Sequence, residues 1–223
     1  MTSIVRPRIL IVVAHPVRDS HTWRVAGTLR ELLGERGASV EIADLHGEEF
    51  NPVITAEDLA HYAGEGRASV DIVREHERLS RQDAVIMLSP MYWWTVSAML
   101  KGWIDRVFTN GWAFGHGAAA GTKAELPFSR GGFVLLTSGS VADLDRHGYS
   151  SAAAAQLPYG VLSYCGRPDS PLLFLEESEA ELTPEKAAHW RGQLEGFLDE
   201  LASENLAIRA LSPSTTSCPI DSH

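Results

Sequence analysis

Three short segments of the sequence concentrate side chains that could bind a ligand or move a proton. The first holds His15, Ser20 and Thr22 and runs directly into a helical pattern. The start of a helix presents free N–H groups and the positive end of the helix dipole, so it suits a phosphate group. From this segment alone a plain helix cap explains the hydroxyls more simply, because such caps are common. The glycine patterns of dinucleotide and P-loop phosphate sites do not occur in it.

The second segment places three aromatic residues side by side. Tyr92, Trp93 and Trp94 follow an apolar run that ends at Ser89. Large aromatic side chains at the end of a strand are hard to bury together and costly to leave exposed. A flat aromatic ligand lying along this segment would resolve the difficulty. The alternative is that the two tryptophans fill the interface between a sheet and a helix.

The third segment, Thr137–Ser140, combines small residues with hydroxyl groups. Such a segment lets a ligand approach the backbone closely. Ordinary connections between a strand and a helix have the same composition, so its position in the fold decides its weight.

A parallel β-sheet would bring the three segments together. Short β-branched runs alternate with longer amphipathic patterns, which predicts a doubly wound α/β domain with five parallel strands and helices on both faces. The strands are expected at 9–14, 39–43, 83–89, 132–138 and 172–175, and the helices at 22–36, 95–108, near 151 and from 183. Ligands of such sheets bind at the carboxyl ends of the strands. The three segments follow Ala14, Ser89 and Ser138 and therefore share that edge.

Two positions break the pattern. The segment His61–Ser69 interrupts an otherwise helical stretch and indicates an insertion or a bent helix. Pro158 is expected to kink the helix near Ser151 or to mark its true start.

Composition limits the functions that fit. The 223 residues, 44% hydrophobic and 22% charged, predict one domain over residues 1–204 with a tail at 205–223 that shows no periodicity. A net charge of −10 argues against duplex DNA or an anionic membrane as a partner. Two cysteines give no disulfide framework and no zinc site, so no metal is expected. No apolar run approaches the ~20 residues of a membrane span, and the apolar run at 9–14 is too short for a signal sequence. A reducing, cytoplasmic setting is therefore expected.

Several motifs, in one order along the chain, resemble those of a known family, the flavodoxin-like NAD(P)H:quinone oxidoreductases. The most specific is Leu100–Phe108 (LKGWIDRVF). The others are Ala14–Pro16 with Ser20, Ser89–Trp93, Gly111–Gly117, Thr137–Gly139, His147–Gly148 and Cys165–Gly166. The resemblance extends from about Ile9 to Leu201. It is closest to short bacterial members, which include the quinone-reductase-like ancillary subunit of a potassium-efflux system.

This resemblance implies a flavodoxin-like fold, a bound flavin, NADH or NADPH as electron donor and a quinone-like acceptor. The flavin is expected to be FMN, with FAD as the alternative. The implied flavin site comprises the phosphate segment with His15, Ser20, Thr22 and Trp23, the ring segment with Pro90, Met91, Tyr92, Trp93 and Trp94, and the segment at the ring's polar edge with Thr137, Ser138, Gly139 and Ser140. Trp112, Phe114 and His116 match residues that wall the acceptor pocket, usually across a dimer interface.

The family resemblance also implies a role for His147, which matches a histidine that some members use in a proton relay. Some members place a tyrosine between the third segment and this histidine, but here that stretch is shorter and contains none. His147 would therefore act alone or only hydrogen-bond the ring. A two-step cycle is expected, in which NAD(P)H gives up its electrons and leaves before the acceptor binds in the same place.

A homodimer is expected as well. The helix that carries Trp103 and Phe108 has more apolar surface than one sheet face can cover, and the following loop with Trp112 and Phe114 is apolar and rich in glycine.

Three other functions compete with this interpretation. A flavin-binding regulatory subunit docked on a transporter would have the same site residues. A zinc-dependent deacetylase shares the strand-Ala-His-Pro pattern, but Pro16 is followed by Val17 and Arg18, and no His-x-x-His pair occurs. A phosphate-receiver domain needs an acidic pair where Ala14 and His15 stand.

Overall fold

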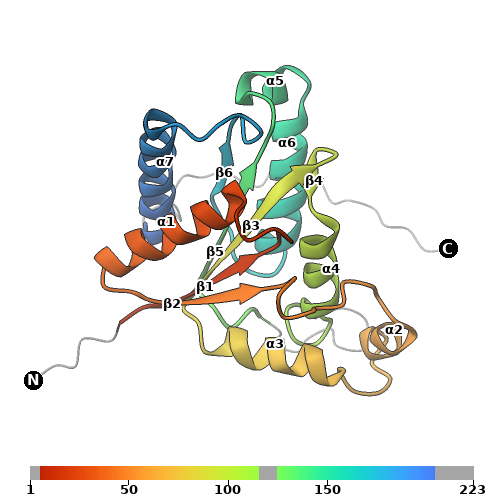
Figure 1. Cartoon of the computed structure of the whole chain (residues 1–223). Coiled ribbons are helices and arrows are strands. Elements are labelled where there is room, and N and C mark those ends of the chain that lie inside the picture. The colour runs from red at the N-terminus through yellow and green to blue at the C-terminus, as the bar shows by residue number, and fades with distance from the viewer. Residues whose placement is uncertain (1–5, 116–124, 204–223) are drawn as a thin grey trace, which may run out of the picture.

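The computed structural model describes residues 6–115 and 125–203 and has a parallel sheet at its centre (Figure 1). The five parallel strands are β1 (Arg8–Val13), β2 (Ser39–Asp44), β3 (Ala84–Tyr92), β5 (Arg130–Leu136) and β6 (Leu172–Leu175). Their order across the sheet is β2-β1-β3-β5-β6, and all neighbours along it run parallel. This is the flavodoxin-like order of a doubly wound sheet, so the predicted fold class is confirmed.

Helices cover both faces of the sheet, and each face has its own core (Figure 1). Alternate residues of β1 point to opposite faces, as the strand period requires. Ile11 packs with α1 (His21–Glu35) and α7 (Pro184–Ala202). Leu10 packs with α3 (Val70–Ser80), α4 (Ala98–Val107) and η2 (Ala155–Ser163). No helix in the described part of the chain is long and apolar enough to cross a membrane.

The expected helix at 95–108 begins later than predicted. Thr95 and Val96 form a short strand, β4, which pairs antiparallel with the end of β3. Both residues are β-branched and favour extended backbone. Ser97 then caps α4, its Oγ accepting a hydrogen bond from the backbone N–H of Leu100 at 3.4 Å. The chain therefore makes a tight hairpin where a direct strand-to-helix connection was expected.

Three further helical features differ from the sequence expectation. The segment at 61–69 contains the end of α2 (Ala56–Tyr62) and the connection at 63–69 to α3, so it bends no continuous helix. Pro158 lies inside η2, a π-helical continuation of α6 (Tyr149–Ala154). A proline donates no N–H, and wider helical turns accommodate it without ending the helix. The short helix α5 (Val141–Arg146) was not predicted.

The family-specific string Leu100–Phe108 builds the core. Trp103 is fully buried, and its Nε1–H donates to Oε2 of Glu75 at 3.0 Å. Phe108 is also buried. The prediction that Trp103 and Phe108 leave apolar surface for a partner is therefore wrong, because the same chain covers both side chains.

Two other residues of the string fix the helix against its neighbours. A Cβ on Gly102 would collide with the backbone carbonyl of Pro52, so only glycine allows this close approach. The guanidinium of Arg106 is 3% exposed. Its N–H groups donate to the Asp58 carboxylate (2.9 and 3.2 Å), the Asp71 carboxylate (2.7 Å), the Asn51 carbonyl (2.8 Å) and the Ser69 hydroxyl (3.3 Å). All five donors of the guanidinium are used.

Candidate flavin site

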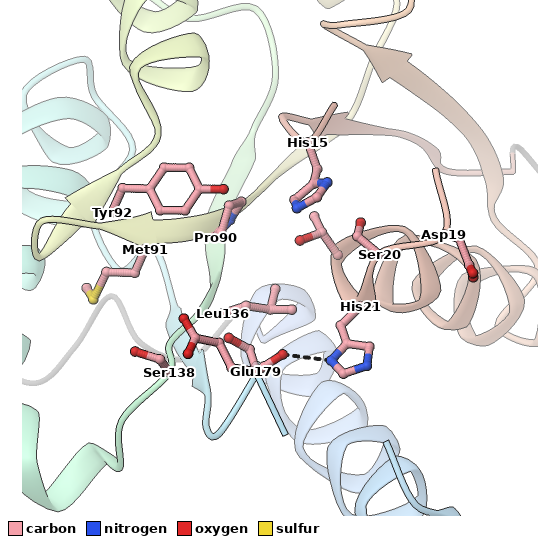
Figure 2. A pocket seen from close by; sticks show the side chains of 12 residues that line it. His15, Asp19, Ser20, His21, Pro90, Met91, Tyr92, Leu136, Ser138 and Glu179 are labelled. Carbon is pink, nitrogen blue, oxygen red and sulfur yellow. Dashed lines mark hydrogen bonds between the residues drawn. The ribbon is translucent and has the colours of Figure 1, made fainter. Parts of the chain in front are cut away.

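A cavity of about 370 Å³ opens at the carboxyl ends of the parallel strands. It joins the predicted phosphate segment to the aromatic segment, which lie far apart in the sequence. Figure 2 shows His15 and Ser20 facing Pro90 and Tyr92 across this space, with Ser138 on another side. The full lining is His15, Asp19, Ser20, His21, Thr22, Pro90, Met91, Tyr92, Leu136, Ser138, Ser178 and Glu179.

The phosphate segment forms the start of α1. Ser20 is the N-cap, and its Oγ accepts from the backbone N–H of Trp23 at 3.4 Å. Ser20 therefore caps the helix, as expected from the sequence. Ser20 and Thr22 also line the cavity. Trp23 does not line it. The Trp23 indole donates to the backbone carbonyl of His15 at 3.1 Å and lies under the guanidinium of Arg18, so it braces the segment from behind.

His15 brings its imidazole ring to the cavity. Nδ1 of His15 lies 3.1 Å from the backbone N of Val17 and 3.2 Å from the Val17 carbonyl oxygen, so it accepts from the first or donates to the second according to the tautomer. Burial lowers the pKa of His15 and the charge of His46 lowers it further, against the opposing effect of the Val17 carbonyl. The lowered pKa favours the neutral ring near pH 7.

The aromatic segment turns tightly between β3 and β4. Met91 pairs with Val96 and Tyr92 with Thr95, which leaves a two-residue turn at Trp93 and Trp94. Both tryptophans have positive φ, 49° and 65°. Two consecutive residues of this kind match a type I′ turn, whose usual residues are asparagine and glycine. Strained backbone of this kind clusters at ligand sites.

Neither tryptophan of this turn fills the sheet–helix interface, so that alternative is wrong. Trp93 is 92% exposed and Trp94 is 44% exposed. The ring of Trp94 stacks face to face on Tyr149, with centroids 4.0 Å apart. Within the described residues, the backbone N–H groups of Trp93 and Trp94 have no hydrogen-bond partner. The turn thus presents free donors and an aromatic surface together.

The third segment contributes less than expected. Ser138 lines the cavity, and the space above Gly139 is open. Thr137 is buried and its Oγ1 accepts from the N–H of Gly139 at 3.3 Å. Ser140 caps α5, accepting from the N–H of Asp143 at 3.1 Å. Thr137 and Ser140 therefore shape the segment, while Ser138 and Gly139 face the open space.

The comparisons with known proteins agree with this geometry. A family model described as "Flavodoxin-like fold" matches residues 7–201. An uncharacterized NAD(P)H oxidoreductase of Escherichia coli, YcaK, is 33% identical over 169 residues, which cover 75% of this chain and 83% of that protein. The chain belongs to the flavodoxin-like family of NAD(P)H oxidoreductases.

A further relative is a quinone reductase, and a solved structure of low sequence identity shares the fold. NAD(P)H dehydrogenase [quinone] 1 of Rattus norvegicus is 32% identical over 182 residues, covering 71% of this chain and 65% of that protein. The FMN complex of an FMN-dependent NADH-azoreductase from Bacillus anthracis shares the fold, with a TM-score of 0.66 at 15% identity, covering 88% of this chain and all of that one.

Nine described residues that the family resemblance implied lie outside the cavity lining: Trp23, Trp93, Trp94, Trp112, Phe114, Thr137, Gly139, Ser140 and His147. His147 is exposed at the end of α5, with its ring 5.8 Å from that of Tyr149. Trp112 stacks on His76 at 3.9 Å, and Phe114 lies against two tyrosines, Tyr62 and Tyr164. His116 lies outside the described residues.

Sequence reasoning missed the segment that follows β6. Ser178 and Glu179 line the cavity. The Ser178 carbonyl lies 2.8 Å from Nδ1 of His21, which ties this segment to the start of α1 (Figure 2). Glu179 and Asp19 bring two carboxylates to the lining, and no lysine or arginine is among its described residues. The carboxyl end of β6 lies on the same sheet edge as the other three segments, which is the signal that could have found it.

Proposed function

We propose that the chain is an FMN-dependent NAD(P)H oxidoreductase that reduces quinone-like acceptors. The observation that carries the proposal is one cavity lined both by the start of α1 and by Pro90, Met91 and Tyr92 at the end of β3. One end suits a phosphate and the other suits a flat ring. The names of the rat and E. coli relatives support the electron donor and the acceptor class.

The chain's own residues divide the binding of FMN among them. The hydroxyls of Ser20 and Thr22, the imidazole of His15 and the first N–H groups of α1 would hold the phosphate. The backbone N–H groups of Trp93 and Trp94 would donate to the polar edge of the ring. When bound, the flavin supplies the hydride chemistry, and the N–H groups stabilise the negative charge of its reduced form. FAD is the alternative cofactor.

The reaction follows a ping-pong order. The flavin would take up the hydride of NAD(P)H, and NAD(P)⁺ would leave before the acceptor binds in the same place. Reduction of a quinone to a hydroquinone takes up two electrons and two protons. His147 is our candidate for supplying a proton, since histidine exchanges protons near neutral pH. Its exposed position beside Tyr149 is compatible with this role once a second subunit covers the site.

A homodimer completes the acceptor pocket in this proposal. Trp112 and Phe114 do not line the cavity of their own chain, and in this proposal they wall the acceptor pocket of the partner subunit. The ring of Phe114 contacts those of Tyr62 and Tyr164, whose side chains are 46% and 63% exposed. Sedimentation is expected to show a dimer at micromolar concentration. A fully active monomer of about 24.3 kDa would contradict this part of the proposal.

The cofactor assignment is tested by spectroscopy. The purified protein is expected to be yellow, and mass spectrometry of the released flavin should give FMN. If FAD is released instead, only the choice of flavin changes. If a colourless preparation takes up neither FMN nor FAD on titration, the proposed function is wrong.

The kinetic assignments need two further measurements. Initial rates at several fixed acceptor concentrations should give parallel double-reciprocal lines, as a ping-pong order requires. His147→Gln keeps a hydrogen-bonding side chain but removes the titrating proton. Stopped-flow rates should show one half-reaction slowed and without its pH dependence near neutrality. Unchanged pH profiles in both half-reactions would remove His147 from the mechanism.

A further inference from the structure

The strained turn at Trp93 and Trp94 needs something to hold it. Two consecutive non-glycine residues with positive φ cost free energy and persist only where the surroundings impose them. Trp93 is 92% exposed and contributes little packing. The restraint must therefore act through Trp94 or through the strands beside it.

The contacts that restrain the turn come from α6 and η2. Tyr149, the first residue of α6, stacks on Trp94 with ring planes 3° apart. Oγ1 of Thr95 donates to Oε1 of Gln156 at 3.3 Å. At the base of the hairpin, the N–H of Ser97 donates to Oγ of Ser89 at 3.1 Å. The stack is thus the contact that acts directly on a turn residue.

The backbone before Tyr149 is shaped to deliver its ring. Gly148 has a φ of 76°, which turns the chain sharply between the end of α5 and the start of α6. His147 ends α5 on the other side of this glycine. The stack therefore links the aromatic turn to the segment that carries His147.

We propose that Tyr149 is a positioning residue that clamps Trp94 and so aims the free N–H groups of the turn at the polar edge of the flavin. The proposal rests on the proposed function, because the flavin is what the turn receives. The aromatic ring does this work and not the hydroxyl, since the contact with Trp94 is a face-to-face stack. Loss of the clamp lets the turn relax, which weakens hydrogen bonds to the flavin without removing any group that touches it.

The test compares three variants of the full chain, titrated with FMN. Tyr149→Ala removes the ring and Tyr149→Phe keeps it. Tyr159→Ala is the matched control, since Tyr159 is 74% exposed and has no ring partner among the described residues. The alanine variant at Tyr149 is expected to bind FMN about 3- to 10-fold more weakly, the range for loss of one aromatic pair. Tyr149→Phe and Tyr159→Ala should stay within about twofold of the wild type.

Two more measurements separate positioning from folding. The reduction potential of bound FMN should shift in Tyr149→Ala and return in Tyr149→Phe, because a misaimed N–H stabilises the reduced flavin less. In the flavin-free protein, amide hydrogen exchange at Ser97, whose N–H donates to Oγ of Ser89 at the base of the hairpin, should accelerate in Tyr149→Ala alone. The exchange experiment needs no flavin, so it tests the clamp even if the wild type binds none and the proposed function fails.

The outcomes that overturn the proposal are distinct. Unchanged FMN affinity and unchanged exchange in Tyr149→Ala would show that the stack restrains nothing. An equal loss in Tyr149→Phe would assign the effect to the hydroxyl. A loss of FMN that follows a fall in melting temperature, in Tyr149→Leu as well as Tyr149→Ala, would make Tyr149 a folding residue.

Discussion

The string Leu100–Phe108 and the cavity at the strand ends differ in how their polar groups are satisfied. In the string, the N–H groups of Arg106 and Trp103 donate hydrogen bonds to partners inside the same chain. Around the cavity, Ser138 and the Trp93–Trp94 turn are exposed, and the free N–H groups of the turn have no partner in the described structure. The most distinctive part of the sequence therefore serves the fold. The site is made of common polar residues and of a turn whose two tryptophans have positive φ, a conformation that the surrounding structure imposes.

This difference has an electrostatic side. Burial alone raises the pKa of Asp58, but hydrogen bonds from Arg106 and Thr55 outweigh it and hold the pKa below its usual range. The pKa of Asp71 is lowered in the same way, with burial opposed by Ser69 and Arg106. Arg106 and Asp58 form a buried pair, while Asp71 is partly exposed. Removal of one partner of a buried pair leaves an unpaired buried charge, which destabilises the fold.

The largest expected effect is on the arginine of the string. Arg106→Gln should lower the free energy of unfolding by about 3–5 kcal/mol, the usual cost of breaking a buried pair. The control is Arg8→Gln, whose partner Asp83 is 3.8 Å away in an exposed pair and whose loss should cost less than about 1 kcal/mol. Urea denaturation at pH 7 measures both. An equal loss of unfolding free energy in the two variants would show that the buried pair of the string stabilises the protein no more than a surface pair does.

Acid should reduce the penalty of Arg106→Gln. The lowered pKa values of Asp58 and Asp71 contribute stability that is present above the unfolded pKa, about 4, and is lost as the pH falls through the folded values. The difference between wild type and variant should therefore shrink below about pH 4. A penalty that does not change with pH would mean that lost packing, and not charge, causes it.

The next effect compares two helical glycines. Gly102→Ala places a methyl group against the carbonyl of Pro52 and should cost about 1–3 kcal/mol through overpacking. Gly192→Ala in α7 meets nothing within 4 Å and should stabilise the protein by up to about 1 kcal/mol. Thermal unfolding of the two variants is expected to shift in opposite directions. A neutral Gly102→Ala would show that Pro52 can move away.

Much of the fold could be predicted because its strands are continuous apolar runs. The runs at 9–14 and 132–138 lie within one or two residues of β1 and β5. The burial of Trp103 could not be predicted, because the residue that receives its N–H, Glu75, comes from α3. Counting apolar residues on one helix does not reveal which distant element covers them.

The site could be located but not built from sequence. The rule for parallel sheets placed the three segments at one edge, and the cavity lies there. The turn at Trp93 and Trp94 has neither the glycine nor the asparagine that signals a type I′ hairpin, so β4 was missed. Glu179 was missed because the segment after β6 has no pattern that marks a ligand site. Tyr149 follows His147, where no tyrosine was sought, and only the structure shows its contact with Trp94.

At the cavity, one substitution separates a cap from a phosphate site. Ser20→Asp preserves the cap of α1, since aspartate caps helices as well as serine does, but sets a carboxylate against the FMN phosphate. The expected result is about tenfold or greater loss of FMN affinity with little change in melting temperature. Thr183→Asp makes the same change at the cap of α7, which does not line the cavity, and should leave FMN affinity unaltered. Full affinity in Ser20→Asp would reduce Ser20 to a cap.

The smallest effect uses one histidine from each region. His76 lies 2.8 Å from the carbonyl of Val107, at the end of the string, and stacks on Trp112. Burial lowers the pKa of His76 and the charge of His61 lowers it further, against the Val107 carbonyl. Burial also lowers the pKa of His15 in the cavity. The unfolded chain therefore takes up protons first as the pH falls below about 6.5, and the native state loses stability there.

Binding of FMN should distinguish how much each of these two histidines contributes to the loss of stability at low pH. A phosphate beside His15 favours the charged ring and raises its pKa, so FMN should abolish the part of the pH dependence that His15→Asn also removes. The part removed by His76→Phe, which keeps a ring against Trp112, should persist with FMN bound. Urea midpoints at pH 7.5 and 5.5, with and without saturating FMN, measure both parts. If FMN leaves the His15 part unchanged, the phosphate does not bind beside His15. If FMN removes the His76 part too, the string and the cavity are coupled and the division between them fails.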